Sequence, residues 1–74
     1  MTASRIVVDS WAWIELFKAS PAGRAAKQII EEAENVFTPG IVLAELARKY
    51  LREGEDIVAI RRWLNSIAES TQVV

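Results

Sequence analysis

Hydrophobic residues fall into two patterns along the chain: short apolar runs, and longer stripes at three- and four-residue spacing. Ile6-Val7-Val8 has no polar residue within it, which predicts a strand buried on both faces. Val36-Phe37 predicts a second short strand, and residues 70–74 predict the start of a third. Stretches with helical periodicity separate these three runs.

Four helices are expected between the strands. The mostly apolar stretch from Trp11 to Lys18 follows Asp9-Ser10, and either of these two residues is suited to cap a helix N-terminus. Ser20-Pro21 begins a second helix, because a capping hydroxyl followed by proline is typical of helix starts. Thr38-Pro39-Gly40 repeats that signal before a third helix over Ile41–Glu53.

The fourth helix is predicted to begin at Glu55-Asp56, after Gly54 has ended the third. Its apolar stripe consists of Ile57, Ile60, Leu64 and Ile67. Strands that alternate with helices indicate an α/β fold, here a short parallel sheet of two or three strands covered by about four helices. Because the chain stops as a third strand begins, we expect it to be part of a larger domain.

Composition restricts the chemistry. The 74 residues contain no Cys and no His, so a metal site would be built from oxygen ligands, which favours Mg²⁺ or Mn²⁺ over Zn²⁺. The formal net charge of −1 gives no global attraction for nucleic acid. Without a long apolar segment or a signal-peptide pattern, a cytoplasmic protein with no membrane contact is expected. Trp11, Trp13 and Trp63 are expected to be core or interface anchors.

Asp9 is the most informative candidate for chemistry. It lies at the carboxyl end of the first strand, where open α/β sheets place their binding crevice. A carboxylate there is suited to hold a hard cation, and it is equally suited to cap the helix that follows. The local pattern alone leaves the two roles evenly balanced.

Two further carboxylates are weaker candidates. The apolar stripe of the third helix is formed by Leu43, Leu46, Ala47, Tyr50 and Leu51. Periodicity places Glu45 roughly opposite that stripe, which favours a solvent-exposed ion pair with Lys49 over a site. Arg48, Lys49 and Arg52 are weak candidates for RNA contacts, since a charged helix face is more often simply solvated. Glu15 is expected to point to water rather than into a cleft.

Three stretches in this order and spacing resemble the PIN domain family, and more narrowly the VapC-type toxins of toxin–antitoxin pairs. Ile6–Ser10 is similar to the family's first strand with its invariant aspartate, and Trp11–Phe17 to the helix after it. Val36–Leu46 resembles the second strand and the helix that bears a conserved glutamate. The resemblance covers residues 1–74 and implies that they form the N-terminal half of a PIN domain.

The resemblance implies metal-assisted hydrolysis of RNA by an endoribonuclease. Asp9 and Glu45 would be catalytic ligands of Mg²⁺ or Mn²⁺, with Ser10 as a supporting residue and Glu15 without a secure role. RNA and a cognate antitoxin protein are the implied partners. The family's remaining acidic residues belong to its second half, so the 74 residues alone are expected to be nearly inactive.

Two alternatives belong to other functional classes. In the first alternative, the chain is a catalytically inactive half-PIN module for binding or oligomerisation. In the second, it is a helical interaction protein unrelated to nucleases. The apolar strands at Ile6 and Val36 argue against the second alternative. In the family the first strand lies between the second and the fourth, so here we expect Ile6-Val7-Val8 to form an unpaired edge that promotes homo-oligomerisation.

Overall fold

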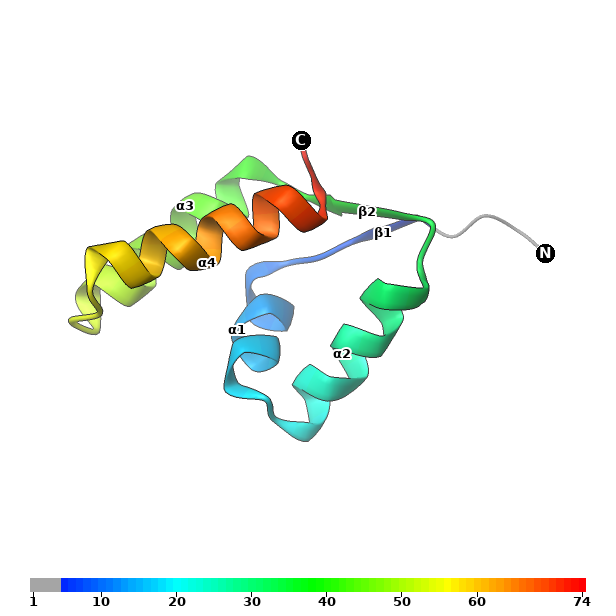
Figure 1. The fold of residues 1–74 in the computed structure, drawn as a ribbon, viewed down its shortest axis with the longest axis horizontal. Coiled ribbons are helices and arrows are strands. Elements are labelled where there is room, and N and C mark those ends of the chain that lie inside the picture. Colours follow the sequence, from blue (N-terminus) through cyan, green and yellow to red (C-terminus); the bar gives the residue numbers. More distant parts are fainter. Residues whose placement is uncertain (1–4) are drawn as a thin grey trace.

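The computed structural model describes residues 5–74, in which four helices accompany a three-stranded sheet (Figure 1). In chain order the elements are β1 Arg5–Val7, α1 Ser10–Lys18, α2 Pro21–Glu32, β2 Asn35–Thr38, α3 Gly40–Arg52, α4 Ile57–Ser70 and β3 Gln72–Val73. The predicted α/β fold with a short parallel sheet is confirmed. No helix in the described part is long and apolar enough to cross a membrane.

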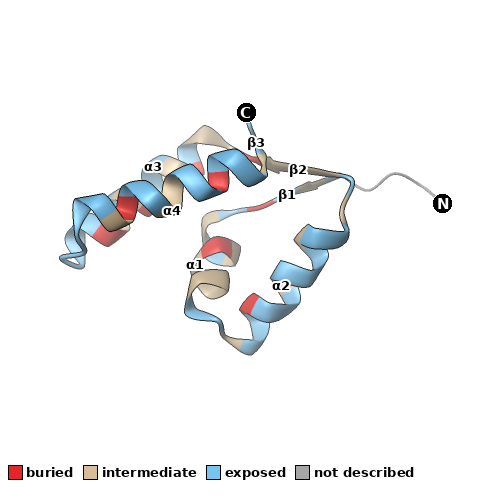
Figure 2. Ribbon diagram, viewed as in Figure 1, coloured by how far each residue is buried: buried red, intermediate tan, exposed pale blue. Residues whose placement is uncertain are grey.

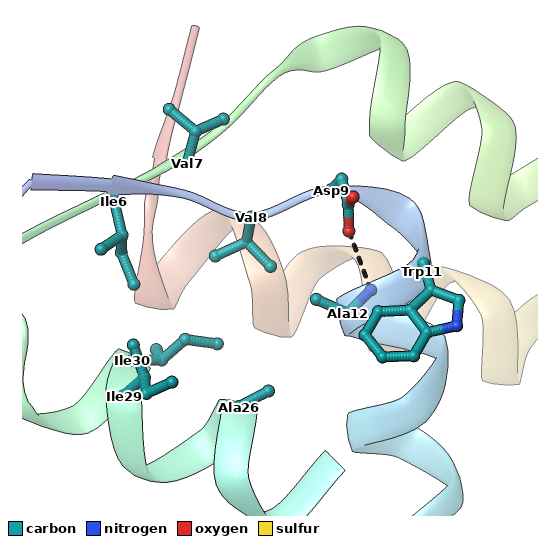
Figure 3. A pocket seen from close by; sticks show the side chains of 9 residues that line it. All are labelled: Ile6, Val7, Val8, Asp9, Trp11, Ala12, Ala26, Ile29 and Ile30. Carbon is teal, nitrogen blue, oxygen red and sulfur yellow. Dashed lines mark hydrogen bonds between the residues drawn. The ribbon is translucent and has the colours of Figure 1, made fainter. Parts of the chain in front are cut away.

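The sheet has the order β1-β2-β3, and both pairs of strands are parallel. β1 is therefore an edge strand within residues 5–74, as expected. The prediction that it is buried on both faces is wrong, because Val7 is 67% exposed. Ile6 and Val8 point toward α2, whereas Val7 points away from it (Figure 3). Helix α2 covers one face of β1 and leaves Val7 on the open face.

The core lies mainly between α1, α3 and α4, while α2 is exposed along most of its length (Figure 2). The buried apolar residues are Val8, Trp13, Val42, Leu46, Tyr50, Ile60 and Ile67. Phe17 stacks between Trp13 and Trp63, with ring centroids 6.0 and 6.1 Å away. The expected anchoring role is thus confirmed for Trp13 and Trp63, whereas Trp11 is 60% exposed.

Three of the helices begin with a side-chain cap. Asp9, Ser20 and Asp56 accept hydrogen bonds from main-chain N–H groups in the first turns of α1, α2 and α4. The predicted cap at Thr38 is wrong. Its hydroxyl is fully buried and lies 2.9 Å from the Thr71 hydroxyl, so it joins β2 to the end of α4. Pro39 occupies the N-cap position of α3 and provides no side-chain hydrogen bond.

Candidate metal site at the carboxyl edge of the sheet

Asp9 lies where β1 passes into α1. The Val8 N–H donates to the Phe37 carbonyl at 2.9 Å, so the ends of β1 and β2 are in register. Because the strands are parallel, α1 and α3 both begin at the same edge of the sheet. This is the edge at which open α/β sheets place ligands.

The Asp9 carboxylate is oriented by the first turn of α1. Its Oδ1 accepts a hydrogen bond from the Ala12 N–H at 2.9 Å (Figure 3), and its carbonyl accepts from the Trp13 N–H at 3.3 Å. The residue is exposed, and Oδ2 has no hydrogen-bond partner among the described residues. Capping is therefore confirmed. It uses one carboxylate oxygen and leaves the other available to a ligand.

Asp9 borders a groove of about 370 Å³ between β1 and α2. The other lining residues are Ile6, Val7, Val8, Trp11, Ala12, Ala26, Ile29 and Ile30. Asp9 is the only titratable side chain among them, so the groove offers no second carboxylate and no cation. This environment is suited to apolar contact rather than to a phosphate.

Glu45 is an exposed residue of α3. The buried stripe of this helix is Val42, Leu46 and Tyr50, whereas Leu51 is 53% exposed. Leu43 and Ala47 of the predicted stripe also pack against the core, so the stripe is confirmed except at Leu51, and Val42 joins it. Glu45 is exposed outside the stripe, as predicted.

Glu45 belongs to a second groove, of about 330 Å³, which it lines with Ile41, Ala44, Arg48 and Arg52. Asp9 and Glu45 thus line separate grooves. Arg48 and Arg52 are exposed beside Glu45, and no ion pair joins them to it among the residues that the structure describes. Their contact with RNA stays a prediction.

The predicted ion pair between Glu45 and Lys49 is wrong. Lys49 pairs instead with Glu53, the C-cap residue of α3. Its ammonium also lies 5.3 Å from the centroid of the Tyr50 ring. Burial raises the pKa of Tyr50 above its ordinary value of 10.0; Lys49 opposes this shift, and Glu53 and Glu55 reinforce it. Lys49 is therefore engaged by Glu53 and Tyr50, while no ion pair joins Glu45 to another of residues 5–74.

Glu15 neither points freely to water nor lines one of these two grooves. Its side chain is 18% exposed, and its carboxylate lies 3.3 Å from the Ser20 hydroxyl and 3.5 Å from the Lys18 ammonium. It therefore joins α1 to the start of α2.

Ser10 is the first residue of α1 and is partly buried, and its supporting role at a metal stays a prediction.

The donor chemistry of Asp9 and Glu45 fits a hard divalent cation, since both supply carboxylate oxygens. The number of donors is small. Within residues 5–74, no group of three or more His, Cys, Asp or Glu side chains is placed to hold a metal ion. Mg²⁺ commonly keeps several waters and binds one or two protein carboxylates, so the pair suits an open site rather than a closed cage.

Comparison with known proteins gives one match. The family model described as the PIN domain matches residues 6–74, a stretch that contains Asp9 and Glu45. No curated protein and no solved structure matches the chain. PIN domains are generally nucleases and typically depend on divalent metal ions. The match extends over nearly the whole sequence, and the chain therefore belongs to the PIN domain family.

Proposed function

We propose that this chain is the N-terminal part of a metal-dependent endoribonuclease of the VapC toxin type, in which Asp9 and Glu45 provide two of the metal-binding carboxylates. One observation carries the proposal: in a chain of the PIN family, Asp9 lies at the carboxyl edge of the sheet with Oδ2 free of partners among the described residues. RNA is the proposed substrate, and an antitoxin protein is the proposed partner.

Each residue has a separate proposed task. The first turn of α1 fixes the direction of the Asp9 carboxylate through the Ala12 N–H. Glu45 supplies a second carboxylate from α3, and the neighbouring Arg48 and Arg52 attract the phosphates of RNA. When bound, a divalent cation supplies charge neutralisation at the scissile phosphate and acidifies an attacking water.

Two carboxylates hold a divalent cation only loosely. Asp9 and Glu45 also line separate grooves, so neither groove alone brings them together. We propose that further acidic side chains, from additional sequence or another chain, complete the site. The 74 residues alone are then expected to bind Mn²⁺ weakly and to cleave RNA slowly.

Mn²⁺ binding provides the first test. The electron paramagnetic resonance signal of free Mn²⁺ is followed while each protein is titrated into the metal. The test variants are Asp9→Asn and Glu45→Gln, and the control is Glu55→Gln, an exposed carboxylate in the turn between α3 and α4. Asparagine is also a good N-cap, so Asp9→Asn removes charge while keeping α1 capped. Each test variant should weaken binding roughly tenfold or more, and the control should leave it unchanged.

Cleavage of a fluorescently labelled RNA in Mn²⁺ is measured on the same four proteins. The proposal expects slow cleavage by the wild-type chain that Asp9→Asn abolishes. Mn²⁺ affinity equal in all four proteins would refute the assignment of the ligands.

A second candidate function is an inactive binding module. It is supported by the lack of a three-carboxylate cluster in the described part of the chain. Mn²⁺ binding that depends on Asp9, without any RNA cleavage, would favour this alternative for the 74 residues.

A further inference from the structure

Two arginines on α3 differ from the lysines of the chain in having no carboxylate partner. Lys18, Lys27 and Lys49 each pair with a carboxylate three or four residues away. Arg48 and Arg52 are exposed, and neither forms such a pair within residues 5–74. A guanidinium binds phosphate through two parallel hydrogen bonds, which an ammonium does not. These two side chains are therefore available to an anionic ligand.

The two arginines continue a line that begins at Glu45. All three residues border the same groove. With a helical step of about 100° per residue, they lie within about 60° of one another around α3. Arg48 lies about 4.5 Å beyond Glu45 along the helix axis, and Arg52 lies about 6 Å beyond Arg48. The line belongs to a single helix, so residues 45–52 alone set its order and spacing.

The line has a defined end and excludes the third cation of α3. Lys49 is paired with Glu53 and is therefore not free for a phosphate. Beyond Arg52, the connection to α4 carries three exposed carboxylates, those of Glu53, Glu55 and Asp56. These negative charges repel a further phosphate. The line thus offers two cationic positions, one turn and two turns after Glu45.

We propose that α3 guides one strand of RNA along this line, with Arg48 binding the phosphate next to the scissile one and Arg52 binding the phosphate after that. The inference rests on the proposed function, which places the scissile phosphate at a cation bound by Glu45. The axial separation of about 6 Å between the two arginines is comparable with the distance between adjacent phosphates of a strand. Because α3 runs from the sheet toward its turn with α4 (Figure 1), the guided part of the strand lies on one side of the scissile bond and leads away from the sheet.

The salt dependence of RNA binding is the first test. Binding of a fluorescently labelled oligouridylate to the 74-residue chain is followed by fluorescence anisotropy in EDTA at a series of salt concentrations. Each phosphate contact to a single strand contributes about 0.7 to the slope of log affinity against log salt. Arg48→Gln and Arg52→Gln should therefore each reduce the slope by about 0.7, and the double variant should reduce it by about 1.4.

Arg62→Gln is the matched control for the loss of one positive charge. Arg62 is also exposed, and it follows the buried Ile60 by two residues, which places it on the opposite side of α4 from the core. This control should keep the wild-type slope. Arg52→Lys should also keep the slope but bind RNA more weakly, because an ammonium lacks the planar pair of donors. Circular dichroism confirms that each variant is folded.

Oligouridylates of increasing length test the order of the contacts. In Mn²⁺, the wild-type affinity should rise steeply up to three phosphodiesters, one at the cation and one at each arginine. Longer oligonucleotides should then gain only in proportion to the number of positions at which they can bind. Arg52→Gln should remove the gain from the third phosphodiester, which is roughly fivefold, and should leave the earlier gain intact.

The line of arginines and the metal ligands can fail separately, because the salt titration in EDTA requires no bound metal. Mn²⁺ affinity that is unaffected by Glu45→Gln overturns the metal assignment, whereas salt slopes that are unchanged in both arginine variants overturn the line. The proposal is also overturned by a wild-type chain that binds no RNA at low salt, or by a slope that Arg62→Gln reduces equally. Affinity that keeps rising by the same factor beyond three phosphodiesters would contradict the proposed number of contacts.

Discussion

The junction of α1 and α2 depends on the absence of a side chain at Gly23, and this gives the sharpest test of the fold. A Cβ atom placed there would lie 1.9 Å from the Glu15 carbonyl oxygen and 2.8 Å from the Leu16 Cα. These are main-chain atoms of α1, so a side chain cannot rotate away to relieve the contact. Gly23→Ala is therefore expected to force the two helices apart.

The size of the effect follows from two opposing contributions. Bringing the 1.9 Å approach to an ordinary contact of about 3.4 Å requires a shift of roughly 1.5 Å between the helices. Overpacking of this kind costs about 3 kcal/mol at the upper end of its usual range. Alanine favours the helix by about 1 kcal/mol relative to glycine. The net destabilisation should be about 2 kcal/mol, which corresponds to a melting temperature lower by roughly 8–16 °C.

Thermal unfolding followed by far-ultraviolet circular dichroism measures this change. Gly40→Ala is the matched control: Gly40 is the first residue of α3, and its added Cβ would meet the Val74 carbonyl oxygen at 3.6 Å, an ordinary contact. The control should melt at or slightly above the wild-type temperature. Equal melting temperatures for the two variants would refute the claim that α1 and α2 pack in direct main-chain contact at Gly23.

Three further predictions concern the core and the sheet. Leu46→Ala removes most of a fully buried side chain and should lower the free energy of unfolding by about 2–5 kcal/mol in urea titrations. A loss below about 1 kcal/mol would contradict the position of Leu46 in the core. Thr38→Val keeps the shape but removes the hydroxyl paired with Thr71, so unfolding experiments should show a loss of about 1 kcal/mol. Burial raises the pKa of Tyr50, so above pH 10 the unfolded chain loses the phenol proton first and stability should fall; Tyr50→Phe should remove this part of the pH dependence.

The elements were predictable where their signals are local. Asp9, Ser20 and Asp56 each cap a helix through a hydrogen bond three residues along the chain, and three residues are enough to encode it. The alternation of strands and helices then gives a parallel sheet, because parallel strands need a crossover between them. Family membership could likewise be read from short motifs in a fixed order.

Several of the incorrect predictions involve partners distant in the sequence. Thr38 has the local pattern of a helix cap, but its hydroxyl is paired with Thr71, 33 residues away. Val7 belongs to an apolar run, and its exposure depends on which helices cover the sheet. Gly23 carries no local signal that distinguishes it from a tolerated helical glycine, since its role depends on the approach of α1.

The placement of Glu45 shows why candidate ligands are easier to name than to orient. A helical stripe read from sequence is defined by apolar residues, and both Val42 and Leu51 qualify. Tertiary packing buries Val42 and leaves Leu51 53% exposed, while Leu43 and Ala47 of the predicted stripe still pack against the core. Glu45 stays on the exposed side of α3, as the periodicity predicts, and the groove that it lines is formed by residues of its own helix. The sequence therefore gives the side of α3 on which Glu45 lies, whereas the approach of Glu45 to Asp9 depends on which elements cover that side.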